Sequence, residues 1–154
     1  MTLTFFVAGK AAPGGSKKAF PIFKGPKGNK VFTGRVAVVD AAGQANKDWR
    51  ANVVQAAFEA MQKANLAPFQ GPVKLELKFI MPRPKDHYRS NGEIKASAPD
   101  WHTKMPDVGK LARSTTDALK GICFRDDAQV SDDHHTKKYG DIIGCAVQIF
   151  ELTT

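Results

Sequence analysis

The segment VKLELKF, residues 73–79, alternates apolar and charged side chains along its whole length. Successive side chains of a β-strand point to opposite faces, so this period of two predicts a strand with one buried and one wet face. The buried face needs a covering layer, and the segments on either side of the strand have the periodicity of helices.

Two helices are expected. From about Gln44 to Asn65, apolar side chains recur at intervals of three and four, which indicates one buried helical face: Trp49, Val53, Ala56, Ala57, Ala60 and Ala64. Pro106 is suited to the first turn of a second helix that runs to about Lys120, where Gly121 can stop it. Its expected packed side consists of Val108, Leu111, Ala112, Thr115, Ala118 and Leu119.

Further strands are expected at residues 2–8, 31–39, 128–138 and 142–152, from their β-branched and aromatic content. Residues 31–39 are a candidate for the far arm of a hairpin. Two connections stand out: a basic, flexible loop at about 9–30 and a long polar loop at about 83–105. This order predicts a single α+β domain over residues 1–154, with two main helices packed on a mixed, largely antiparallel sheet.

The composition is that of a globular protein. The chain has 154 residues, of which 42% are hydrophobic and 25% charged. No apolar run approaches the roughly 18 residues that a membrane span requires. The run at residues 2–8 has no basic leader and no cleavage site, so we expect no signal peptide. Cys123 and Cys145 are expected to be reduced core residues, and the chain is expected in the cytoplasm.

The formal net charge of +8 is unevenly distributed. Residues 1–39 contain no Asp or Glu and seven basic residues, namely Lys10, Lys17, Lys18, Lys24, Lys27, Lys30 and Arg35. The remainder has 16 basic and 15 acidic residues. An uncompensated cationic segment attracts polyanions, although a merely solubilising loop has the same composition. An anionic membrane is a weaker candidate partner, because the segment has no amphipathic helical stripe.

Acidic residues gather around the second helix. Asp107 stands at its start, Asp117 lies within it, and Asp126-Asp127 follow it. Carboxylates amid basic groups are typical of a Mg²⁺ site that cleaves phosphodiesters. Taken alone the pattern favours a simpler explanation, since Asp more often caps helix N-termini and Asp-Asp more often lies in solvated turns.

The two blocks are more specific when they are taken together. Residues 105–119 read MPDVGKLARSTTDAL and residues 124–130 read FRDDAQV. This resembles the RusA family of Holliday junction resolvases, whose pattern is Pro-Asp-x-Asp-(Asn/Lys)-Leu-x-(Lys/Arg), then Asp-Ala-Leu, then Asp-Asp-(Ala/Ser)-Gln-(Val/Ile). Residues 14–18 with Phe20, the pair Trp49-Arg50 and the pair Lys137-Lys138 also resemble family members.

The resemblance implies roles residue by residue. Asp107 corresponds to the first metal-site aspartate and Asp127 to the catalytic aspartate of the acidic pair, with Asp126 beside it. Together they would hold Mg²⁺, which orients and activates water for attack on phosphorus. Arg113 would contact the scissile phosphate, and Lys110 would help to neutralise its charge. The DNA backbone would be bound by further basic residues: Lys10, Lys17, Lys18, Arg35, Arg50, Lys137 and Lys138.

One position departs from the family pattern. Gly109 stands where the second Asp of Pro-Asp-x-Asp is expected, and glycine supplies no ligand. Three interpretations are open: a natural change, a deliberate inactivating substitution, or a site rescued by Asp126, Asp132 or another acid.

The implied function is a crossover junction endodeoxyribonuclease that resolves four-way DNA junctions in recombination and repair. A homodimer is expected, since the junction is two-fold symmetric and resolution needs two nicks. Gly109 predicts impaired activity. The alternatives are a non-catalytic branched-DNA-binding protein and, less favoured, a basic module that binds an acidic protein.

The histidines give little indication of a metal site. His134 and His135 are adjacent on an expected strand, so their side chains point to opposite faces and cannot easily share a zinc ion. His87 and His102 lie in the long polar loop without cysteine partners, and we expect them to be solvated.

Overall fold

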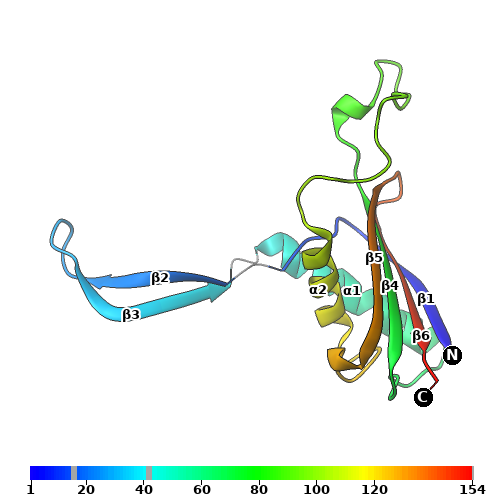
Figure 1. Ribbon diagram of the computed structural model, residues 1–154, viewed down its shortest axis with the longest axis horizontal. Helices are drawn as coiled ribbons and strands as arrows, with labels where there is room; N and C mark the ends of the chain where they lie inside the picture. Colours follow the sequence, from blue (N-terminus) through cyan, green and yellow to red (C-terminus); the bar gives the residue numbers. More distant parts are fainter. Residues whose placement is uncertain (15–16, 41–42, 154) are drawn as a thin grey trace.

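The body of the protein is a four-stranded sheet covered on one face by two helices (Figure 1). The computed structural model describes residues 1–14, 17–40 and 43–153, and side chains for residues 1–14, 21–36 and 43–153. The strand order is β1-β6-β4-β5, made of β1 (Thr2–Ala8), β6 (Gly144–Glu151), β4 (Val73–Met81) and β5 (Val130–Tyr139). Only the β4–β5 pairing is parallel in this sheet. The prediction of an α+β fold with a mixed, largely antiparallel sheet is confirmed.

The central strand β4 has the alternation that its sequence predicts. Val73, Leu75, Leu77 and Phe79 are buried, whereas the side chains between them are partly or fully exposed. The helices α1 (Gln44–Lys63) and α2 (Val108–Leu119) lie over this buried face. Burying such apolar side chains contributes about 1.5–3 kcal/mol each. The strand and its covering helices therefore form the core that positions the ends of α2.

Buried polar contacts fix the two helices relative to each other. Trp49 Nε1 donates to Thr115 Oγ1 at 3.0 Å, and Asn46 Nδ2 donates to Ser114 Oγ at 2.6 Å. The expected burial of Ala64 is wrong, because α1 ends at Lys63 and Met61 fills the last inward position instead.

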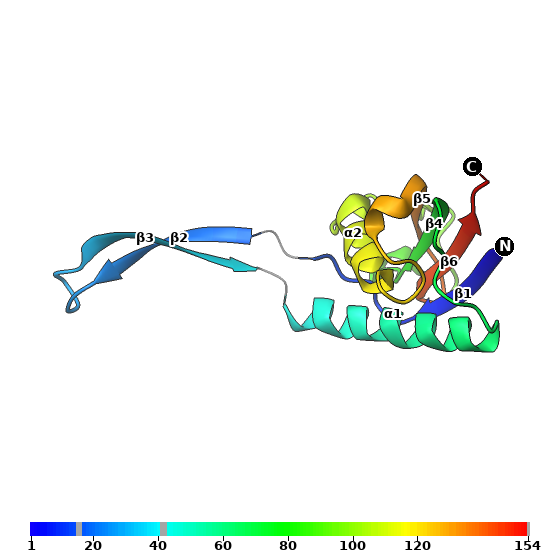
Figure 2. The same cartoon turned by 90° about the horizontal axis from the view of Figure 1, so that it is seen from below.

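The expected loop at 9–30 is wrong for residues 17–24. Strand β2 (Lys17–Lys24) pairs antiparallel with β3 (Val31–Asp40) in a separate two-stranded sheet. This hairpin stands away from the body in two perpendicular views (Figures 1 and 2). Pro21 lacks an N–H, which a ribbon with unpaired outer edges tolerates.

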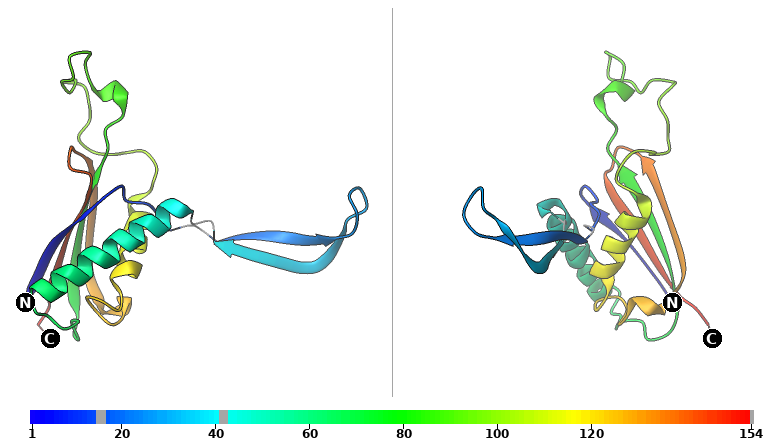
Figure 3. Two further views of the ribbon diagram at one scale, coloured as in Figure 1. Left: turned by 180° about the vertical axis from the view of Figure 1, so that it is seen from behind. Right: turned by 60° about the vertical axis from the view of Figure 1, so that its left-hand side comes forward.

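The long polar loop is tied to the end of β5, beyond the helices (Figure 3). It contains one short 3₁₀ helix, η1 (Lys85–His87). The Tyr139 ring contacts the rings of His87 and His102, each at 4.8 Å between centroids, and the Arg83 guanidinium lies 5.4 Å from it. The expectation that these histidines are solvated is therefore wrong for His87, which is buried, and for His102, which is half-buried.

Both cysteines are free and buried, as predicted. Burial raises the pKa of each thiol, Cys123 and Cys145, to about 12. Within the described part of the chain, no helix is long and apolar enough to cross a membrane.

Candidate active site at the ends of helix α2

Asp107 is the N-cap residue of α2. Its Oδ1 accepts a hydrogen bond from the Lys110 backbone N–H at 3.0 Å, which satisfies one of the free donors of the first turn. The carboxylate is exposed. That hydrogen bond, with a smaller contribution from the charges of Lys110 and Lys137, lowers the pKa of Asp107 below its ordinary value. The side chain is therefore an anion at neutral pH, available to a cation.

Lys137 holds the chain just before Asp107. Its Nζ donates to the carbonyl oxygens of Lys104 and Pro106, both at 2.7 Å. Burial lowers the pKa of Lys137, while the negative charge of Asp107 opposes that shift. Lys137 is predicted to bind DNA, but in the structure its ammonium is bonded to the main chain just before Asp107. Its positive charge also offsets part of the negative charge of the Asp107 carboxylate.

The outer face of α2 carries other predicted residues, two near its start and one near its end. Lys110, Arg113 and Asp117 are exposed, while Leu111 and Thr115 face the core. Residues 110 and 113 lie three apart in the helix, so both cations are on the same face of α2.

Gly109 lies against the carboxylate of Asp107. A Cβ built at Gly109 would be 3.1 Å from Asp107 Oδ1 and would contact no other group beyond its neighbours. The position is exposed. An aspartate side chain there would therefore place a second carboxylate beside the first, once Asp107 Oδ1 moves by a few tenths of an ångström.

A groove of about 580 Å³ opens beside this end of α2. It is formed by the segment after β1, the first turns of α1 and the residues before Asp107, and its lining includes Lys10, Trp49 and Pro106. The structure thus brings Lys10 to the same end of α2 as Asp107. Neither the sequence spacing nor the charge distribution indicates this proximity.

The acidic pair lies at the other end of α2, in the 3₁₀ helix η2 (Asp127–Gln129). Asp126 is its N-cap and accepts from the Ala128 N–H at 3.0 Å. This hydrogen bond lowers the pKa of Asp126, with smaller contributions from the neighbouring Asp127 side chain and from the charge of Lys120. Asp127 is exposed next to it. Two carboxylates are therefore presented to solvent by one rigid turn.

Gln129 fixes that turn. Its Oε1 accepts from the N–H groups of Arg125 and Asp126 at 2.8 and 2.9 Å, and its Nε2 donates to the carbonyl oxygens of Phe69 and Gly71 at 2.8 and 2.9 Å. Sequence reasoning missed this positioning role. The capping-box spacing of Asp126 and Gln129 is the signal that could have revealed it.

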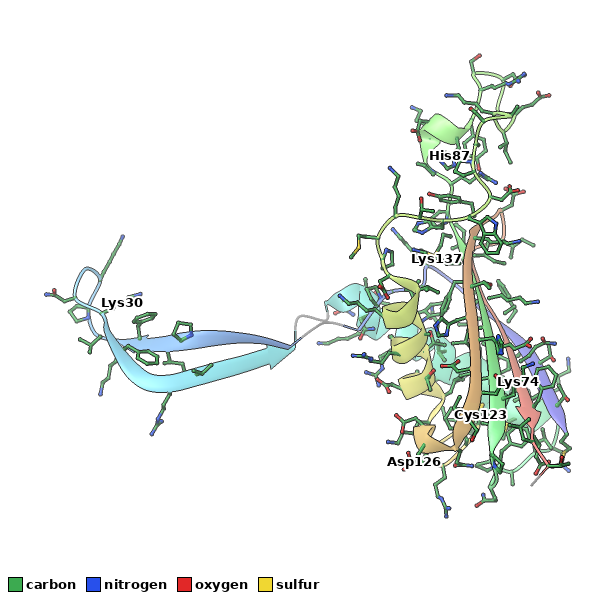
Figure 4. All side chains as sticks on the ribbon, in the orientation of Figure 1. Lys30, Lys74, His87, Cys123, Asp126 and Lys137 are labelled. Atoms are coloured by element: carbon green, nitrogen blue, oxygen red, sulfur yellow. The ribbon has the colours of Figure 1, made fainter. Side chains whose placement is uncertain are left out.

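The two groups of carboxylates are far apart within one chain. Helix α2 has 12 residues, which at 1.5 Å per residue separates its ends by about 18 Å. Figure 4 shows Asp126 near one end of α2 and Lys137, which contacts the segment before Asp107, toward the other. Among the described residues, no three His, Cys, Asp or Glu side chains are close enough to hold a metal ion. The residues of a single chain therefore do not fit the expected magnesium site.

The candidate replacement ligand Asp132 is also distant from Gly109. It precedes Lys137 by five residues on β5, or about 16 Å, and its Oδ1 lies 2.9 Å from His134 Nε2. Asp126 is at the far end of α2. Neither residue is near Gly109 in the same chain.

The remaining predicted DNA-binding residues are dispersed. Arg35 is exposed on the hairpin and Arg50 on α1. Lys138 Nζ lies 4.1 Å from the centroid of the Trp101 ring. The side chains of Lys17 and Lys18 are outside the described set.

The family model of the RusA endodeoxyribonucleases matches residues 25–150, which is most of the chain and includes both ends of α2. No curated protein matches. Because the matched segment contains the Asp107 and Asp127 blocks in the order that the sequence resemblance requires, the chain belongs to the RusA family of endodeoxyribonucleases.

Proposed function

We propose that this protein is a Mg²⁺-dependent, structure-selective endodeoxyribonuclease that acts as a homodimer and resolves Holliday junctions by paired nicks. Membership of the RusA family implies a nuclease of the Holliday junction resolvase type that binds branched DNA. The observation that carries the proposal is the exposed, anionic carboxylate of Asp107 at the start of α2, with Lys110 and Arg113 on the adjoining exposed face.

The proposed homodimer accounts for the separation of the carboxylates. RusA-family nucleases generally depend on a divalent metal, and hard cations such as Mg²⁺ prefer carboxylate oxygens. One chain offers Asp107 at one end of α2 and Asp126 with Asp127 at the other. A two-fold dimer that joins unlike ends of α2 would bring Asp107 of one copy to Asp127 of the other, and would do so twice. Two identical sites are what two paired nicks require.

The basic residues have two proposed tasks. Arg113 and Lys110 stabilise charge on the phosphate that reacts at the Asp107 end. Lys10, Lys17, Lys18, Arg35, Arg50 and Lys138 bind the DNA backbone at a distance from that phosphate. Lys137 contributes chiefly by holding the chain before Asp107, because its ammonium is already bonded to two carbonyl oxygens.

Gly109 makes the proposed site incomplete. The family pattern places an aspartate there, and in this structure the position adjoins the Asp107 carboxylate. We therefore propose that cleavage by this chain is impaired. The same observation favours a second candidate function, a branched-DNA-binding protein that does not cut. Action in the cytoplasm stays a prediction.

One experiment separates these functions. The chain is incubated with an end-labelled immobile four-way junction, with and without Mg²⁺, and both cleavage and the shift in a native gel are followed. Mg²⁺-dependent nicks at symmetric positions support the nuclease, and a shift without nicks supports the binding protein. A chain that neither shifts nor cuts the junction contradicts both.

A further inference from the structure

The β2–β3 hairpin ends in a compact loop that has three exposed lysines in it or at its base. Lys24 and Val31 pair at the base of this loop, and Lys27 and Lys30 lie within it. Gly25 has a φ of +122°, and a Cβ there would come within 2.6 Å of the Asn29 carbonyl oxygen, so only glycine fits. The three lysines are exposed, and Figure 4 shows Lys30 at the far tip.

Behind the loop, the hairpin exposes two phenylalanines. Phe23 and Phe32 pair across the strands with ring centroids 5.9 Å apart, yet their exposed fractions are 53% and 50%. Val31, next to Phe32 in the chain, is also exposed. A two-stranded ribbon has no core of its own in which to bury such side chains. Exposed apolar side chains gathered in this way mark an interaction surface.

The charge of the segment identifies the partner. Residues 1–39 contain seven basic residues and no acid, whereas the remainder of the chain is nearly balanced. A hairpin from a second copy would bring like charge against like charge, and residues 40–154 of a second copy have no net negative charge, with 16 basic and 15 acidic residues. DNA offers a continuous polyanion, so the lysines favour DNA over another copy of this chain.

DNA phosphates can bind the lysines, but they offer no apolar surface to the rings of Phe23 and Phe32. The large apolar surfaces of DNA are the faces of its bases, which a continuous duplex hides by stacking. Stacking is interrupted where the four arms of a junction meet, so base faces are more accessible there. Aromatic side chains stack on such bases without regard to sequence.

We propose that the β2–β3 hairpin recognises the branch point: Lys24, Lys27 and Lys30 bind the flanking phosphates, and the rings of Phe23 and Phe32 stack on bases exposed at the crossover. The inference rests on the branched-DNA binding proposed above. Beyond that binding, the β2–β3 hairpin is the part of the chain that would distinguish a junction from a duplex.

The test compares dissociation constants for a four-way junction and a linear duplex at one salt concentration. In the double variant Phe23→Leu/Phe32→Leu, apolar bulk remains but stacking is lost. We expect the junction dissociation constant to rise about 10-fold and the duplex constant to change by less than about twofold. The matched control Val36→Leu changes an exposed apolar residue of the same hairpin and should leave both constants unchanged.

A second measurement locates the contact. A 2-aminopurine base at the branch point should change its fluorescence on binding of the wild-type chain and of Phe23→Tyr/Phe32→Tyr, but not of the leucine variant. An unchanged preference for the junction in the leucine variant overturns the hairpin role alone. A wild-type chain with no junction preference overturns the proposed function as well. A lower molar mass of the leucine variant in light scattering would show that the phenyl rings contact a second copy of the chain. That result also overturns the inference.

Discussion

Asp107 caps the start of α2, and Asp126 caps the short 3₁₀ helix η2 that follows the other end of α2. Each accepts a backbone N–H at 3.0 Å, Asp107 from Lys110 at the start of α2 and Asp126 from Ala128 just beyond its end. The same kind of hydrogen bond lowers the pKa of both carboxyls. The two anionic sites thus lie beyond opposite ends of a helix about 18 Å long, and the proposed metal site would need one end from each of two copies.

Restoring the missing carboxylate should increase cleavage. Gly109→Asp places a second acid beside Asp107, in a space that needs only a small movement of that side chain. We expect at least about a 10-fold gain in Mg²⁺-dependent nicking of a four-way junction. The control is Gly109→Asn, which has a similar size and no charge. If the two variants cut equally well, a missing carboxylate ligand is not the cause of the impairment.

Lys17 and Lys18, the first two residues of β2, should contribute to the salt dependence of junction binding. Each phosphate contact contributes about 0.9 to the slope of log K against log salt on duplex DNA. Lys17→Gln/Lys18→Gln should therefore flatten that slope for junction binding by about 1–2. Lys63→Gln, at the far end of α1, serves as the control. An unaltered slope in the double variant would rule out a phosphate role for Lys17 and Lys18.

Removal of the Lys137 ammonium should disturb Asp107. Lys137→Met deletes both hydrogen bonds to the segment before Asp107, at a cost of about 1–2 kcal/mol in the free energy of unfolding. The positive charge that helps to lower the pKa of Asp107 also disappears, so this pKa should rise in a carboxyl NMR titration. Lys138→Met, whose ammonium lies over Trp101, is the matched control. Identical Asp107 titrations in the two variants would contradict the positioning role.

The mass in solution should be that of a dimer. The chain has a mass of 16.8 kDa, and light scattering at micromolar concentration should give twice this value. A monomeric mass at that concentration, unchanged by adding Mg²⁺ and junction DNA, would contradict the homodimer.

Most of the fold could be predicted from the sequence, because β4 and α2 have strong periodicity. Strand β2 could not, since Lys17–Lys24 shows no regular alternation and contains Pro21; pairing with β3 makes it a strand. The burial of His87 depends on a loop that folds back on Tyr139, which no local pattern encodes.

The candidate site was only partly accessible from the sequence. The Asp107 and Asp127 blocks are local signals, and both fall within the family match. The distance between them follows from the length of α2, so their separation in one chain could have been predicted. The contacts of Lys137 with Lys104 and Pro106 could not, because they join segments about 30 residues apart through the tertiary fold.

Complementation between two inactive chains tests the shared site most directly. Asp107→Asn and Asp127→Asn are prepared separately in the Gly109→Asp background, then refolded together. A mixed dimer with sites built from both copies has one site with both substitutions and one with neither. We expect neither variant alone to nick the junction. In the mixture, about a quarter of all sites should have neither substitution, so about a quarter of the nicking activity of the Gly109→Asp chain should return. A mixture no more active than its separate components would contradict a site shared between two copies.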